Sequence, residues 1–165
     1  MKSAVVSLCL ASLTLFLAGC RQADGPMPTP NAQAKEDLED IRHDLEYIAN
    51  GRDSDAPQYL MDDLTKYARR PSAVPAVEEL SRRVATTLPG TKFSEQNGQR
   101  LAHSLWQSIA AVDTSERQIE TMQNDVQALL VSIGVAEQGA QRVAAQLGEV
   151  QKAVNNRPRR WYEVF

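Results

Sequence analysis

The hydrophobic residues of this chain recur every three or four positions over most of its length, and this spacing predicts α-helices. In residues 35–50 the apolar stripe runs through Leu38, Ile41, Leu45 and Ile48, at intervals of three, four and three. Five later segments repeat the pattern, with stripes at Leu60, Leu64 and Tyr67 or Ala68; at Val77, Leu80, Val84 and Leu88; at Leu101, Leu105, Trp106, Ile109 and Val112; at Ile119, Met122, Val126, Leu129, Leu130 and Ile133; and at Ala140, Val143, Leu147, Val150 and Val154. No segment shows convincing alternation of period two, so no sheet is expected.

Residues that begin and end helices stand between these stripes. Asp55 and Ser94 are expected to cap the second and fourth helices, and Asp113 with Glu116 resembles a capping box for the fifth. The expected stop signals are Asn50-Gly51, Arg70-Pro71, Pro89-Gly90, Gly134 and Arg157-Pro158. The third helix is expected to begin near Pro75. The sequence therefore predicts an all-α fold, a small bundle of about five to six short amphipathic helices.

The last two stripes have heptad-like spacing over about three heptads each, which favours an antiparallel pair inside a bundle. The sixth helix also carries small residues that would let a neighbour approach closely, at Ala136, Gly139, Ala140, Ala144 and Gly148.

Residues 1–19 have the organisation of a signal peptide. One positive charge at Lys2 precedes an apolar run over residues 4–17, which is too short to span a membrane because spanning needs about 20 apolar residues. The run closes on Leu17-Ala18-Gly19-Cys20. A leucine three residues before a cysteine, with two small residues between them, resembles the lipobox of bacterial lipoproteins.

The resemblance covers residues 1–20 and implies that the chain is cut before Cys20, which receives a diacylglyceryl thioether and an acylated amine. Two or more acyl chains give stable membrane anchoring. In enteric bacteria an Asp after the lipidated cysteine favours retention in the inner membrane, and here that position is Arg21. The resemblance thus implies the periplasmic face of the outer membrane ahead of the inner membrane. The alternative is an ordinary secretory signal that leaves Cys20 as a free thiol.

Residues 21–33 are expected to form a disordered linker. Three prolines and a glycine with no apolar period cannot pack a core. At about 3.1 Å per residue the linker could hold the domain up to roughly 40 Å from the lipid headgroups. The expected division is a signal peptide over 1–19, the lipidated cysteine and linker over 20–33, a helical domain over 34–156 and a tail over 157–165.

Charge and cysteine content exclude several classes of function. The net charge of −3 becomes about −4 when Lys2 leaves with the signal peptide, which argues against nucleic-acid binding. The only cysteines are Cys9, which is removed, and Cys20, so the mature domain has no disulfide, thiolate metal site or cysteine nucleophile. No metal and no cofactor is expected.

Acidic and basic residues are unevenly distributed. Residues 34–63 contain ten acidic side chains against three basic ones, whereas residues 141–165 contain five basic side chains against two acidic ones. The acidic front and the basic end could attract each other within the fold, or each could face a separate partner.

Few residues offer catalytic chemistry. Glu39 and His43 stand one helical turn apart, next to Asp44, and could share a metal or a proton, but a solvated surface pair is the simpler interpretation. The stretch from Asp53 begins like a calcium loop, and Pro57 then occupies a position that needs Asp or Asn. No Gly-x-Ser-x-Gly, Ser-x-x-Lys or phosphate-loop motif is present. The chain is therefore not expected to be an enzyme.

The C-terminal tail combines arginines with large aromatic residues. Its candidate partner-binding residues are Arg157, Arg159, Arg160, Trp161, Tyr162 and Phe165. Water is an unfavourable environment for so many large apolar side chains, so the tail is expected to dock. It could dock on its own bundle, with the arginines reaching the acidic first helix. It could instead bind an envelope protein or insert its aromatic residues at a membrane interface.

These observations predict a lipid-anchored cell-envelope protein with a helical interaction or structural module. Membrane attachment is expected through a lipid on Cys20, and an envelope protein partner is expected at the tail. Two alternatives stay open: a lipid-anchored enzyme that uses carboxylate and histidine chemistry near Glu39–Asp44, and a periplasmic chaperone or inhibitor with an apolar groove between helices. The sequence leaves the oligomeric state open.

Overall fold

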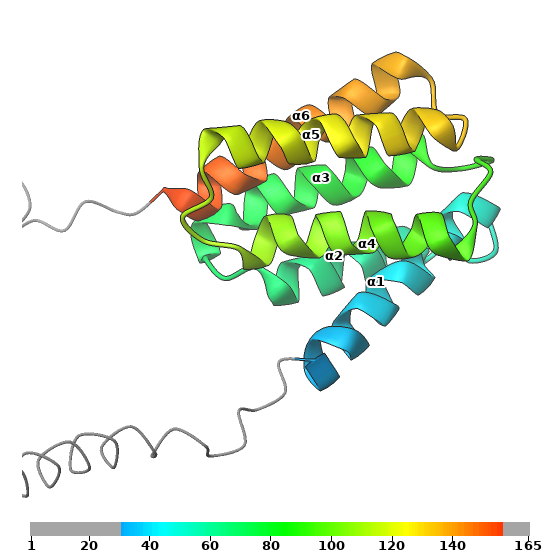
Figure 1. Cartoon of the computed structure of the whole chain (residues 1–165). Coiled ribbons are helices and arrows are strands. Elements are labelled where there is room, and N and C mark those ends of the chain that lie inside the picture. The colour runs from blue at the N-terminus through cyan, green and yellow to red at the C-terminus, as the bar shows by residue number, and fades with distance from the viewer. Residues whose placement is uncertain (1–30, 157–165) are drawn as a thin grey trace, which may run out of the picture. The chain divides into compact units, whose positions relative to one another are not determined.

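The computed structural model describes residues 31–156, and this part of the chain is all-helical, which confirms the predicted fold class (Figure 1). The elements are α1 (Asn31–Asn50), α2 (Ala56–Tyr67), the 3-10 turn η1 (Pro71–Ala73), α3 (Val74–Thr87), α4 (Glu95–Ala110), α5 (Glu116–Ser132) and α6 (Glu137–Asn155). The chain is helical from Asn31, so residues 31–33, expected in the linker, belong to the first helix. The expected signal peptide and lipobox of residues 1–20 and the expected tail of residues 157–165 lie outside the described residues.

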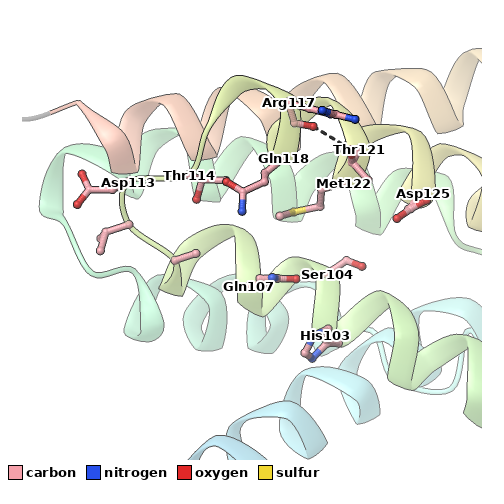
Figure 2. Close-up of a pocket in the computed structure, with 12 residues that line it drawn as sticks. His103, Ser104, Gln107, Asp113, Thr114, Arg117, Gln118, Thr121, Met122 and Asp125 are labelled. Carbon is pink, nitrogen blue, oxygen red and sulfur yellow. Dashed lines mark hydrogen bonds between the residues drawn. The ribbon is translucent and has the colours of Figure 1, made fainter.

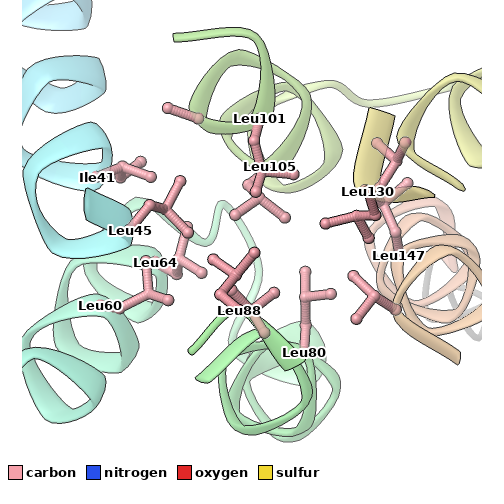
Figure 3. Packing of buried hydrophobic residues seen from close by; sticks show 14 of the residues in the cluster. Ile41, Leu45, Leu60, Leu64, Leu80, Leu88, Leu101, Leu105, Leu130 and Leu147 are labelled. Carbon is pink, nitrogen blue, oxygen red and sulfur yellow. The ribbon is translucent and has the colours of Figure 1, made fainter. Parts of the chain in front are cut away.

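The predicted apolar stripes converge on one core (Figure 3). Each side chain buried there contributes about 1.5–3 kcal/mol relative to exposure. The largest side chains that are almost completely buried are Ile41, Leu45, Leu60, Leu64, Leu80, Leu88, Leu101, Leu105, Ile109, Leu130, Ile133 and Leu147. Val112 is an exception, because α4 ends at Ala110 and the valine beyond it is 42% exposed. Its assignment to the apolar stripe was wrong.

Helices α5 and α6 form the predicted antiparallel pair and lie side by side over most of their length (Figure 1). Gly148 of α6 lies directly against the side chain of Gln123, so a Cβ atom at that position would overlap the glutamine amide. The Gln123 Nε2 donates a hydrogen bond to the carbonyl oxygen of Ala144 at 3.1 Å. The close approach of the two helices thus depends on small residues of α6, as the sequence predicts.

Gly134 ends α5 as predicted, in a left-handed conformation with φ of 101°. Its N–H donates to the Val131 carbonyl at 3.1 Å, and the N–H of Val135 donates to the Leu130 carbonyl at 3.0 Å. This pair of bonds is the Schellman motif, which satisfies the last carbonyl groups of a helix.

The helix caps agree with the sequence in one case and differ in two. The Ser94 hydroxyl accepts a hydrogen bond from the N–H of Asn97, so the predicted cap of α4 is confirmed. The capping box of α5 joins Ser115 to Gln118, two residues after the predicted pair, because Asp113 has a left-handed φ of 60° and cannot begin the helix. The Asp55 side chain makes no capping hydrogen bond. The backbone N–H of Asp55 instead donates a hydrogen bond to the Asp53 carboxylate at 2.8 Å.

Helix α1 lies at the edge of the bundle and runs at an angle to the other helices (Figure 1). Its apolar residues Ile41 and Leu45 reach the core beside Leu60 and Leu64 of α2 (Figure 3). The Ala49 carbonyl near its C-terminal end accepts a hydrogen bond from the loop before α4, at 2.9 Å. The position of α1 determines which of its many charged residues face α2.

Candidate interaction surface

Five aspartates gather where α1 meets α2, and we call this set the acidic face. It consists of Asp37, Asp40 and Asp44 of α1, Asp53 of the connecting loop and Asp63 of α2. Residues 37, 40 and 44 share one side of α1 because they follow its helical repeat. The short loop of residues 51–55 then leads into α2, and Asp63 of this helix acts on Asp44 through its charge.

Asp44 occupies the centre of the acidic face and is almost buried, with 7% of its surface exposed. Its Oδ2 atom is buried and has no hydrogen-bond partner among the described residues. The pKa of Asp44 is raised from 3.8 to about 7, chiefly by burial and in addition by the carboxylates of Asp63, Asp40 and Asp53. A buried charge without a partner is costly, so Asp44 is held in an environment that favours a proton or a cation.

The negative charge on the α2 side of the acidic face is only partly balanced, by the positive charge of Lys66. Burial and the nearby Asp40 carboxylate raise the pKa of Asp63, whereas the charge of Lys66 acts in the opposite direction. The Lys66 Nζ donates to the Tyr67 hydroxyl at 3.3 Å, and Tyr67 in turn has a side-chain hydrogen bond with Asp37. This chain of contacts joins the N-terminal part of α1 to the C-terminal end of α2.

Of the residues that suggested acid–base chemistry in the sequence, Glu39 and His43 lie close together at the surface, whereas Asp44 lies apart from them. The Glu39 carboxylate binds Arg42, at 2.5 Å between Oε1 and Nη2, and this hydrogen bond lowers the pKa of Glu39. The His43 Nε2 lies 3.7 Å from the same oxygen, and both side chains are more than half exposed. Asp44 faces α2 instead, because neighbouring residues of a helix point about 100° apart.

A groove of about 580 Å³ opens between α4 and α5 (Figure 2). Its lining mixes apolar and polar residues, namely His103, Ser104, Gln107, Ala111, Val112, Asp113, Thr114, Arg117, Gln118, Thr121, Met122 and Asp125. Two of its hydroxyl groups are engaged by the backbone, since Ser104 donates to the Arg100 carbonyl and Thr121 donates to the Arg117 carbonyl. The groove therefore contains no serine–histidine pair suited to nucleophilic catalysis.

A smaller hollow of about 370 Å³ lies between α2 and α3 and bears on the chaperone alternative. Its lining residues are Pro57, Gln58, Met61, Ser81, Arg82, Ala85 and Thr86. This is the most apolar opening among those described, but none of its side chains is a large exposed hydrophobic residue.

Sequence reasoning recognised the acidic excess of this region but not the burial of Asp44 against α2. A signal was present, because Asp37, Asp40 and Asp44 follow intervals of three and four residues beside the apolar stripe. The other predicted site residues are Cys20, Arg157, Arg159, Arg160, Trp161, Tyr162 and Phe165, and all of them lie outside the described residues.

Residues 31–156 contain no group of three or more His, Cys, Asp or Glu side chains that could hold a metal ion. The carboxylates of the acidic face are spread along two helices, with about 10 Å of helix rise between Asp37 and Asp44. No helix in the described part of the chain has the length and apolar character needed to cross a membrane. The chain was also compared with protein-family models, curated proteins and solved structures, and no match was found in any of the three.

Proposed function

We propose that this chain is a lipid-anchored protein of the bacterial cell envelope whose helical domain binds a cationic polypeptide through the acidic face. The anchor is proposed from Leu17-Ala18-Gly19-Cys20, with the linker that follows it holding the domain away from the membrane. Arg21 supports the outer membrane ahead of the inner membrane as the site of attachment.

The observation that carries the binding function is the buried, unpartnered Oδ2 atom of Asp44 among three further carboxylates. Like charges this close destabilise the folded domain, and a cationic ligand would relieve that repulsion. An arginine guanidinium suits the site well, because it can donate two parallel hydrogen bonds to one carboxylate. An extended basic peptide also fits carboxylates distributed along two helices better than a single ion does.

Acid–base catalysis is a second candidate, because a carboxyl group with a pKa of about 7 is suited to proton transfer at neutral pH. Glu39 and His43, the residues that would assist such a proton transfer, lie on another side of α1. The substitution His43→Ala separates the two functions. It leaves peptide binding unchanged if the acidic face is a docking surface, whereas loss of the cellular phenotype in this variant would favour catalysis.

The anchor is tested by the Cys20→Ala variant. If Cys20 carries the lipid, this variant moves from the membrane fraction to the soluble fraction of fractionated cells. A Ser7→Ala variant, altered within the signal peptide but not at the lipobox, serves as the matched control and stays in the membrane fraction. Unchanged membrane retention of the Cys20→Ala protein would refute the anchor.

The binding function is tested with a peptide of three arginines separated by alanines, titrated against the full chain in detergent micelles. We expect NMR shifts in α1 and α2 and at least a tenfold weaker affinity in the Asp40→Asn/Asp63→Asn variant, because charge-assisted hydrogen bonds contribute about 1.5–3 kcal/mol each. The control variant, Glu120→Gln/Asp125→Asn, removes two exposed acids from α5 and keeps the original affinity. Equal affinities in all three proteins would overturn the proposal.

A further inference from the structure

The chain itself carries a basic segment that begins beside the acidic face. The carbonyl oxygen of Asn156, the last described residue, accepts a hydrogen bond from the Arg70 Nη1 at 3.1 Å. Arg70 lies three residues after Tyr67, whose side chain is hydrogen-bonded to Asp37. The exit of the chain from α6 is therefore fixed close to the end of the face at which α1 begins and α2 ends.

We infer that residues 157–165 dock on the acidic face of the same chain, with their arginines against the aspartates and their aromatic residues beyond them. This inference rests on the proposed function, because it names the segment that occupies the same surface when no partner is bound.

The length of the tail is sufficient for this arrangement. Nine extended residues reach about 30 Å. From Arg70 to Tyr67 the chain spans at most about 11 Å, and from the Tyr67 end of α2 to Tyr59 the helix rises about 12 Å. The part of the acidic face around Asp63, between Tyr67 and Tyr59, thus lies within reach of the tail without any movement of the six helices.

The tail places its basic residues before its aromatic residues, and along α2 the aspartates likewise come before an exposed tyrosine as the chain leaves the end of α6. Three arginines stand in the first four positions of the tail, and would meet Asp63 and the α1 aspartates first. Trp161 and the residues after it would then lie one helical turn further along α2. At that position Tyr59, 49% exposed and four residues before Asp63, offers an apolar ring on the same side of the helix.

The tail arginines would not have to displace an ion pair that these aspartates already form with another described residue. Lys66 donates to the Tyr67 hydroxyl, and no ion pair of Asp40, Asp44 or Asp63 is found within the described residues. A segment tethered by a few residues has an effective concentration of order 1 mM. The docked tail would thus act as an internal competitor that only a more strongly binding basic partner displaces.

The test compares the full chain with a tail-neutralised variant, Arg157→Gln/Arg159→Gln/Arg160→Gln, in detergent micelles. A guanidinium within about 4–6 Å of a carboxylate favours its charged form by one to three pKa units. The NMR titration midpoint of the Asp44 carboxyl should therefore rise by at least one pH unit in the variant. The matched control, Arg100→Gln/Arg117→Gln/Arg142→Gln, removes three exposed arginines from other helices and leaves the midpoint in place. Substitution of the tail arginines by lysine should largely retain the wild-type midpoint.

The three-arginine peptide distinguishes failure of this inference from failure of the proposed function. If the tail occupies the face, the peptide binds the tail-neutralised chain at least tenfold more tightly than the wild-type chain. Equal binding to both chains, with equal Asp44 midpoints, overturns tail docking and leaves the acidic face as a binding surface. Absence of binding to the tail-neutralised chain overturns the proposed function itself.

Discussion

Replacing Asp44 by asparagine should stabilise the domain above neutral pH, because asparagine keeps the shape of the side chain and removes its charge. The carboxyl has a pKa of about 7 in the folded chain and an ordinary value of 3.8. The difference of about three units corresponds to at most about 4 kcal/mol. The carboxylates of Asp40, Asp53 and Asp63 account for part of this penalty, and Asp62, Lys66 and Tyr67 are the other titratable groups of α2 near the site.

The sign of the pH dependence follows from proton binding. Below pH 3.8 the carboxyl is protonated in both the folded and the unfolded chain, so its burial is least costly there. Between about pH 4 and 7 the folded chain keeps a proton that the unfolded chain has lost, so the free energy of unfolding falls as the pH rises. Above pH 7 the full penalty is present in the wild-type protein and absent from the Asp44→Asn variant.

Urea unfolding followed by circular dichroism at pH 4, 6 and 8 measures this effect. We expect the Asp44→Asn variant to be more stable than wild type by about 1–4 kcal/mol at pH 8, with a smaller difference at pH 4. The advantage should be larger in the tail-neutralised background, where no arginine offsets the charge. Asp125→Asn, a substitution of an exposed carboxyl on α5, is the control. The same pH dependence in wild type and Asp44→Asn would refute the reasoning.

Three further substitutions test the fold by urea unfolding. Ser115→Ala removes the capping box of α5 and should lower the free energy of unfolding by about 1 kcal/mol. Glu116→Gln alters the pair suggested by the sequence and should lower it by less. The reverse order would contradict the assigned cap. Gly134→Ala places a side chain at a φ of 101° and should cost about 1–2 kcal/mol, and an unchanged stability would rule out that backbone conformation. Leu130→Ala opens a cavity in a site that is 1% exposed and should cost about 2–5 kcal/mol, while a loss below 1 kcal/mol would place Leu130 outside the core.

Local signals predicted most of the helices, because a helix depends largely on residues three or four positions apart. The stripe from Ala140 to Val154 is buried at every predicted position, and Gly134 ends α5 as expected. The predicted cap at Asp113 was wrong, since two nearby residue pairs have capping chemistry. The left-handed backbone at Asp113 decides in favour of the pair that begins at Ser115.

The candidate site was less predictable, because charge alone does not show which acidic residues are buried. Glu39 and Asp44 have similar surroundings in the sequence, yet Arg42 forms an ion pair with the first and the second is buried. This distinction depends on the angle of α1 against the bundle, which local spacing does not specify. The groove between α4 and α5 likewise arises from the packing of two helices and has no motif of its own.

By itself the sequence determined an all-α domain, its apolar core and the absence of cysteine from residues 31–156, because these follow from helical periodicity and from composition. Only the tertiary structure decided that Asp44 is buried opposite Asp63 and that the end of α6 is held at Arg70. Both results bring together residues distant in the chain. Such contacts are selected by how whole helices pack, and the energy of a buried charge depends on those contacts rather than on its neighbours in sequence.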